Sequence, residues 1–160
     1  MQPRLQFKRF VETDYYPKYA LDGDCGIDIP LIFDDVLSSN GIIDINVDNK
    51  GRYILFHPYT WIRFRTGVGF KIPDGYWGDI RSRSSTGFKR KLITFPGTID
   101  AGYTGEIYVL VFNPNNYKVK IYENDKLIQL VIHKSHTFDI IEVDELPNTE
   151  RGRNGFGSTG

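Results

Sequence analysis

The sequence predicts an all-β fold, a jelly-roll-like β-sandwich or barrel with at most one short helix. The chain has only two alanines, the best helix former, whereas aromatic residues make up 14% of it. Sixteen glycines and eight prolines provide many turn positions. No window of a dozen residues carries an apolar stripe of helical period, and short β-like runs recur between the turns. These observations favour about ten short strands.

The first half of the chain is divided into short runs by turn residues. Residues 5–11 alternate between apolar and polar side chains, whereas residues 27–33 are mostly apolar. The polar turn at residues 48–51 separates two apolar runs and therefore predicts a hairpin. The expected strands of this half are residues 5–11, 27–33, 42–47, 53–56, 61–65 and 68–72.

The second half continues the pattern. The strand expected at residues 76–83 leads into residues 84–87, a loop or one short helical turn. Residues 107–112 are continuously apolar, which is typical of a strand buried on both faces. Residues 117–121 alternate with lysines and predict a half-exposed strand. Residues 127–132 and 138–143 complete the expected set.

Length, charge and cysteine content limit the classes of protein. We expect a single β domain over residues 1–148, with a hairpin insertion at about 42–56, and a mobile glycine-rich arm over residues 149–160. The formal net charge is zero, which argues against a general nucleic-acid binder. No apolar run approaches the roughly 18 residues of a membrane span, and we see no signal peptide. The single cysteine, Cys25, fits a cytoplasmic or other intracellular reducing compartment.

Several polar residues occupy positions where they could do chemistry. Arg83, followed by two serines at the end of a predicted strand, suits an anion site, although such pairs also occur in purely structural roles. Asp100 lies at a turn and is either a general base or a residue that shapes the turn. Tyr103 offers a flat ring for stacking on a sugar or base. Asp28 and Gln129 interrupt apolar runs, so each needs a partner or a ligand.

Five segments in a fixed order favour the functional interpretation. They are DCGID at residues 24–28, PDGYWGDIRSRSS at 73–85, GTIDAGYTGE at 97–106, DKLIQL at 125–130 and RGRNGFGSTG at 151–160. Their order and residue types resemble the five motifs of the trimeric dUTP pyrophosphatase (dUTPase) family. The third and fifth segments are the most specific.

The resemblance implies an enzyme that hydrolyses dUTP to dUMP and pyrophosphate as a homotrimer with active sites shared between subunits. It implies that Asp100 activates the water that attacks the α-phosphorus and that Tyr103 packs under the deoxyribose. Asp28 would act through water on Mg²⁺, which the triphosphate otherwise holds. The other positions implied to bind substrate are Arg83, Ser84, Ser85 and Gln129 for the phosphates, Thr94, Gly97 and Ile99 around the uracil, and Arg151, Phe156, Gly157, Ser158 and Thr159 in an arm that closes over a neighbouring subunit's site.

The chain departs from the family pattern at Thr94, where asparagine is frequent, and at Thr104, where arginine is usual. Two other interpretations stay open at this point. One is a dCTP deaminase-like enzyme with the same fold, which the intact fifth segment argues against. The other is an interaction protein whose nucleotide-bound state gates partner binding, for which the predicted hairpin at 42–56 is the relevant feature.

Overall fold

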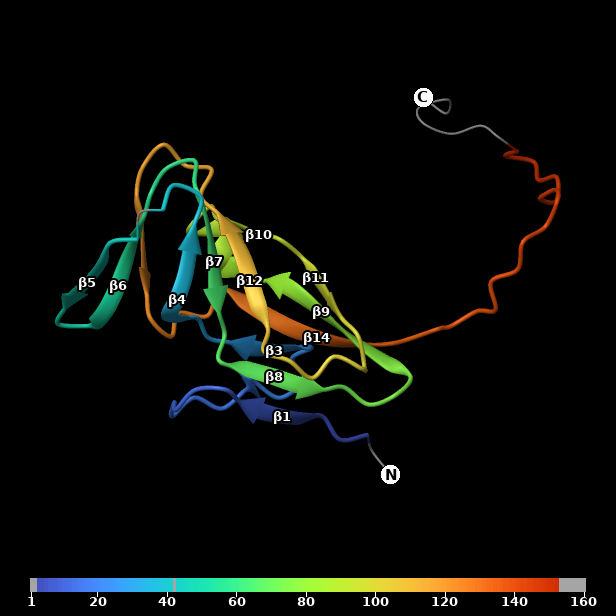
Figure 1. The fold of residues 1–160 in the computed structure, drawn as a ribbon, viewed down its shortest axis with the longest axis horizontal. Coiled ribbons are helices and arrows are strands. Elements are labelled where there is room, and N and C mark those ends of the chain that lie inside the picture. The colour runs from blue at the N-terminus through green and yellow to red at the C-terminus, as the bar shows by residue number, and fades with distance from the viewer. Residues whose placement is uncertain (1–2, 42, 153–160) are drawn as a thin grey trace.

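The structure is a computed structural model that describes residues 3–41 and 43–152, and nearly all of its regular elements are strands (Figure 1). Its 14 strands and one short helix within these residues confirm the predicted fold class. The elements are β1 (Gln6–Arg9), β2 (Lys18–Tyr19), β3 (Gly26–Ile29), β4 (Ile32–Ser38), β5 (Ile45–Asp48), β6 (Gly51–Phe56), β7 (Trp61–Arg65), β8 (Val68–Lys71), β9 (Tyr76–Ser82), α1 (Ser84–Phe88), β10 (Ile93–Thr94), β11 (Gly97–Ile99), β12 (Tyr108–Phe112), β13 (Val119–Tyr122) and β14 (Ile128–Lys134).

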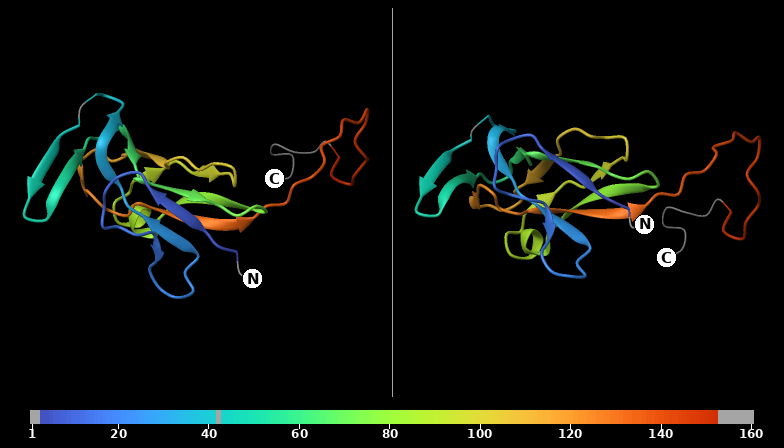
Figure 2. Two further views of the ribbon diagram at one scale, coloured as in Figure 1. Left: turned by 60° about the horizontal axis from the view of Figure 1, so that its bottom comes forward. Right: turned by 90° about the horizontal axis from the view of Figure 1, so that it is seen from below.

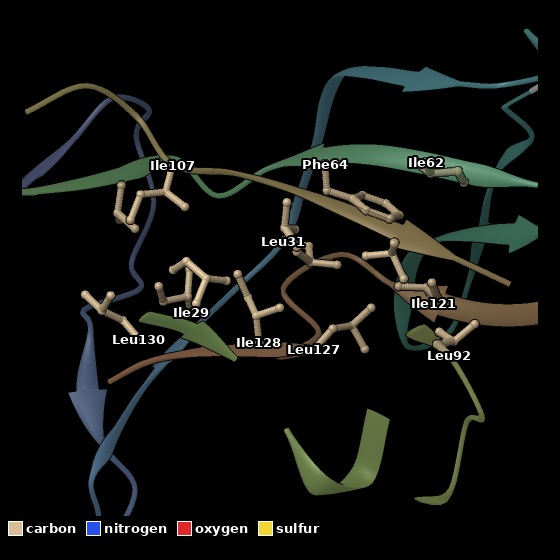
Figure 3. Packing of buried hydrophobic residues seen from close by; sticks show 14 of the residues in the cluster. Ile29, Leu31, Ile62, Phe64, Leu92, Ile107, Ile121, Leu127, Ile128 and Leu130 are labelled. Carbon is tan, nitrogen blue, oxygen red and sulfur yellow. The ribbon is translucent and has the colours of Figure 1, made fainter. Parts of the chain in front are cut away.

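Two antiparallel sheets enclose the core. The larger sheet has the strand order β11-β9-β14-β3-β2, and the second has the order β10-β12-β7-β4. In Figure 3, Ile62 and Phe64 of β7 lie on one side of the core, and Ile29 of β3 and Ile128 of β14 lie on the other. All four side chains are at most 2% exposed. Alternate side chains of each strand therefore face inward and form the core of the sandwich that the composition predicts.

Two smaller sheets complete the fold. β1 pairs with β8, and β5 and β6 form a hairpin that joins β13 in the order β13-β6-β5. The hairpin extends away from the body of the molecule (Figure 1). Its base belongs to the core, because Ile54 and Phe56 of β6 are buried.

Polar contacts fasten the outer end of the hairpin. The Asp48 carboxylate accepts hydrogen bonds from the Lys50 backbone N–H at 2.9 Å, from Lys120 at 3.0 Å and from the Tyr122 hydroxyl at 2.9 Å. These donors, the Lys50 N–H first, lower the pKa of Asp48 from 3.8 to about 2. The hairpin is thus tied to β13 by an ionised carboxylate.

One predicted strand is wrong. Residues 138–143 form no strand, and the chain after β14 runs away from the sheets without regular structure as far as residue 152 (Figure 2). Their side chains have nothing to pack on, since Phe138 is 83% and Ile140 99% exposed. Alternating apolar residues form a strand only where a partner strand is available, and the described residues of a single chain provide none here. No helix in the described residues has the length and apolarity to cross a membrane.

Candidate active site

Three neighbouring strands bring together the polar residues of the first, second and fourth segments. Gln129 of β14 lies opposite Asp28 of β3 on one side and Arg81 of β9 on the other. Arg83 follows β9 directly, and its Nε lies 2.8 Å from Asp28 Oδ1. Lys126 Nζ approaches the other oxygen of Asp28 at 3.7 Å. The buried carboxylate therefore lies between two cations, which satisfies the need of a buried charge for partners.

Three of these residues, Asp28, Arg83 and Gln129, line a pocket of about 260 Å³. Ser84 adds a hydroxyl to it, and Asp24 and Cys25 complete its polar side chains. Ser85, the next residue of α1, does not line the pocket. The remaining lining residues are Ala20, Gly26 and Val131. The lining contains one cationic side chain, Arg83, and two carboxylates, Asp24 and Asp28, together with hydroxyl and amide groups. Arg83 with these donors is the part of the pocket that suits an anionic ligand.

A glycine makes room for the Gln129 side chain. A Cβ atom on Gly26 would lie 2.0 Å from Gln129 Oε1, a distance that no real contact allows. The Gln129 amide donates a hydrogen bond to the Ser82 carbonyl at 3.4 Å. Gly26 therefore fixes where the amide lies in the pocket.

A second group of predicted residues lies on the turn after β11. Asp100 is exposed there, and its carbonyl accepts the Tyr103 N–H at 3.0 Å. The Tyr103 hydroxyl donates to the Glu106 carbonyl at 2.7 Å. Glu106 is buried and forms a bidentate ion pair with Arg65 of β7, whose closest N–O distance is 2.8 Å. The turn that carries Asp100 is thus held to the β7 side of the fold by a charged pair.

The residues expected around a base lie beside this turn. Thr94 of β10 pairs with Val111 of β12. Gly97 and Ile99 of β11 pair with Ile80 and Gly78 of β9. The backbone groups of the short strands β10 and β11 therefore lie in the segment directly before the Asp100 turn.

The two groups are far apart within one chain. Ile99 lies opposite Gly78, so Asp100 is level with the start of β9, whereas Arg83 follows its end. A strand rises about 3.3 Å per residue, so about 20 Å separates them along β9. A single chain does not bring Asp100 to the pocket of Asp28 and Arg83.

The fifth segment is only partly described. Arg151 is exposed near the end of the described chain. Phe156, Gly157, Ser158 and Thr159 lie outside the described residues.

Metal-ligating side chains are sparse. No group of three or more His, Cys, Asp or Glu side chains suited to a metal ion occurs within residues 3–41 and 43–152. Asp24 and Asp28 are the carboxylates that line the pocket, and Asp28 is paired with Arg83.

Sequence reasoning did not single out three residues that support these two groups. Lys126 contacts Asp28, and Arg65 and Glu106 hold the Asp100 turn. Lys126 and Glu106 lie inside recognised segments, so their position in the chain was a signal for a role. Arg65 carried no such signal, because a single arginine in a strand of alternating apolar and polar residues looks like an ordinary exposed residue.

Comparisons with known proteins give a consistent result. The family model described as dUTPase matches residues 32–160. The chain is 34% identical over 158 residues to the deoxyuridine 5'-triphosphate nucleotidohydrolase of Alkaliphilus metalliredigens, covering 98% of this chain and 96% of the relative. It is 32% identical over 159 residues to the enzyme of the same name from Hydrogenobaculum sp., covering 98% of each.

Solved structures agree with these sequence matches. The dUTPase of Staphylococcus bacteriophage 80alpha with dUPNHPP is 25% identical, with a TM-score of 0.77 and 99% of each chain covered. The dUTPase of phage phi11 of S. aureus, described with a structural Mg(II) ion, has the same fold, with 24% identity and a TM-score of 0.69 over 89% of this chain and 98% of that one.

Proposed function

The chain belongs to the dUTPase family and is a dUTP diphosphatase, and we propose that a water activated by Asp100 attacks the α-phosphorus of its substrate. The products are then dUMP and pyrophosphate. The observation that carries this proposal is the arrangement of the predicted residues in two groups, a pocket that contains Arg83 and a carboxylate on an anchored turn.

Asp100 is suited to the role of general base. It is exposed, so water reaches it, and two hydrogen bonds of Tyr103 fix the turn on which it lies. A base must be held within hydrogen-bond reach of the water that it deprotonates. The Arg65–Glu106 ion pair restrains the same turn and so limits the positions that Asp100 can take.

The pocket of Arg83, Ser84 and Gln129 is proposed to bind the phosphates. Attack on a triphosphate must overcome repulsion between the nucleophile and a polyanion, and positive charge with fixed donors lowers that barrier. Arg83 and Lys126 both contact the buried carboxylate of Asp28. An incoming phosphate would meet the charge of Arg83, because this side chain lines the pocket.

Magnesium is proposed as the cofactor. Mg²⁺ keeps several waters and binds one or two carboxylates together with substrate phosphates. Asp24 and Asp28 are the carboxylates that line the pocket, and Asp28 would contact through water a metal ion that the triphosphate holds. When bound, the ion would spread the charge of the phosphates.

The base and sugar are proposed to bind at the second group. Backbone groups of Thr94, Gly97 and Ile99 would read the uracil, and the half-exposed ring of Tyr103 would pack under the deoxyribose. We further propose that Arg151, Phe156, Gly157, Ser158 and Thr159 close over a neighbouring subunit's site. In this arm Phe156 would stack on the uracil, and Arg151 would meet the terminal phosphate.

We propose a homotrimer with shared sites. Two observations support it. The Asp100 turn and the Arg83 pocket are about 20 Å apart in one chain, so one substrate requires two copies to engage both. In addition, Phe138, Ile140 and Ile141 are more than three-quarters exposed, which indicates that another chain covers this segment.

The free and exposed Cys25 supports a reducing compartment as the place of action.

Hydrolysis in H₂¹⁸O tests the reaction and the atom attacked. Attack at the α-phosphorus places ¹⁸O in dUMP, whereas label in pyrophosphate would contradict the proposal. Asp100→Asn should lower kcat by about 10²–10⁴-fold, as expected for loss of a general base, while dUTP still binds. Release of ammonia from dCTP in the same assay would instead indicate the deaminase reaction.

A further inference from the structure

The segment before β2 places a tyrosine against Asp28. Tyr15 lies outside the five motif segments and outside residues 32–160 of the family match. Its hydroxyl donates a hydrogen bond to the backbone carbonyl of Asp28. Lys126 Nζ lies 5.6 Å from the centroid of its ring, within the range of a cation–π contact. The same ammonium is 3.7 Å from Asp28 Oδ2. Tyr15 therefore contacts both Asp28 and the cation beside it.

Local structure fixes this tyrosine in place. Its backbone N–H donates to Thr13 Oγ1 at 3.2 Å, and β2, which follows, pairs with β3 so that Lys18 lies opposite Asp28. Burial, followed by the charge of Asp28, raises the pKa of Tyr15 to about 12. The phenol thus stays protonated and keeps donating its hydrogen bond throughout the physiological pH range.

We propose that Tyr15 is a positioning residue for phosphate binding: it holds Lys126 beside Asp28 and thereby leaves Arg83 available for the substrate. This inference rests on the proposed role of Arg83. A buried carboxylate needs a cationic partner. If Arg83 were the only partner, its transfer to a phosphate would leave Asp28 unpaired. With Lys126 held in place, Asp28 keeps a partner while Arg83 turns to the triphosphate.

Two substitutions at Tyr15 separate the ring from the hydroxyl. Tyr15→Leu removes both contacts and should raise KM for dUTP about five- to tenfold. Tyr15→Phe keeps the ring under Lys126 and should raise KM by no more than about threefold. Because Tyr15 does not touch the attacking water, kcat should stay within about twofold in both variants. Affinity for a non-hydrolysable dUTP analogue, measured by calorimetry, should fall by the same factors as KM rises.

Tyr16→Leu is the matched control. Tyr16 is the adjacent tyrosine, but its ring contacts Phe7 and Arg9 of β1 instead of the pocket. It should leave KM and kcat unchanged while removing a ring of the same size.

A double-mutant cycle tests whether Tyr15 acts through the lysine. Lys126→Met should raise KM, and adding Tyr15→Leu to it should raise KM little further, since the cation that the ring holds is already absent. Additive effects, a wild-type KM in a folded Tyr15→Leu variant, or a loss confined to kcat would each overturn the inference. If Tyr15→Leu does not fold, Tyr15→Met, which keeps apolar volume but has no ring, takes its place in the cycle with Lys126→Met. Absence of dUTP hydrolysis in the wild type would instead refute the proposed function.

Discussion

Two inactive variants should restore activity when they are mixed, if each site combines residues of two subunits. Asp100→Asn removes the proposed base from the turn, and Arg83→Ala removes the proposed phosphate ligand from the pocket. About 20 Å separates these positions within one chain, so no chain serves one substrate with both. In a mixed oligomer, an intact Arg83 of one subunit can meet an intact Asp100 of its neighbour.

The size of the rescue follows from counting neighbours. After equal amounts of the two variants are unfolded together and refolded, each subunit of a closed ring is of either kind with equal chance. One neighbouring pair in four then has an intact Arg83 on the first subunit and an intact Asp100 on the second, so pyrophosphate release should reach about a quarter of the wild-type rate. This fraction does not depend on the number of subunits in the ring.

A second mixture serves as the control. Arg83 and Gln129 line the same pocket of one chain, so Arg83→Ala mixed with Gln129→Ala produces no intact pocket and should stay inactive. Each refolded mixture is checked for equal mass by light scattering. If the Asp100→Asn and Arg83→Ala mixture stays as inactive as its parents in an oligomer that contains both kinds, the shared site is refuted.

Three further results are expected. Gly26→Ala places a Cβ 2.0 Å from Gln129 Oε1 and should raise KM for dUTP by about tenfold or more, with a minor change in kcat. An unchanged KM in the folded variant would show that the Gln129 amide does not bind substrate. The pKa of Asp48 is lowered from 3.8 to about 2, so its contribution to hairpin stability is present above pH 3.8 and is lost as the pH falls toward 2. Lys120→Met should move the Asp48 pKa back toward 3.8 in a carboxyl NMR titration, and an unchanged pKa would contradict the contact. Replacing residues 47–52 by a two-residue turn should keep kcat/KM for dUTP within about threefold of the wild-type value, because these residues lie outside both site groups. A larger loss of kcat/KM in an intact oligomer would place the hairpin in the active site.

The sandwich was predictable because its strands carry their own signal. Residues 107–112 are continuously apolar, and most of them form β12, which pairs with β7. The strand is not buried on both faces as expected, because Val109 and Val111 face the core whereas Tyr108 is 44% exposed. The hairpin turn at residues 48–51 was also predicted from local chemistry alone, and residues 84–87, expected as a loop or one short helical turn, form most of α1. Local residue patterns determine these elements, so tertiary information was not needed.

The failures occur where structure depends on distant partners. β10 and β11 have two and three residues, too short for any periodicity, and they form because β12 and β9 offer free edges. Residues 138–143 show the reverse case, a good strand pattern without a partner in the chain. The same reasoning applies to the site: motif order gave Asp28, Arg83 and Gln129, whereas the contact of Tyr15 with Asp28 spans 13 positions and has no sequence signature.

Two features of the single chain point to association: its two groups of proposed site residues lie far apart, and apolar side chains after β14 are exposed. The carboxylate proposed as base and the cations proposed to hold the phosphates lie at opposite ends of β9, and the strand keeps them apart. The segment that follows β14 exposes Ile140 and Phe138, and apolar side chains gathered on a surface are typical of an interface with another chain. Association of copies would remove both defects, because it buries apolar side chains and brings a turn of one copy to a pocket of another. Hydrophobic burial would then supply the free energy that assembles the site, so activity would require the assembled oligomer as much as the folded subunit.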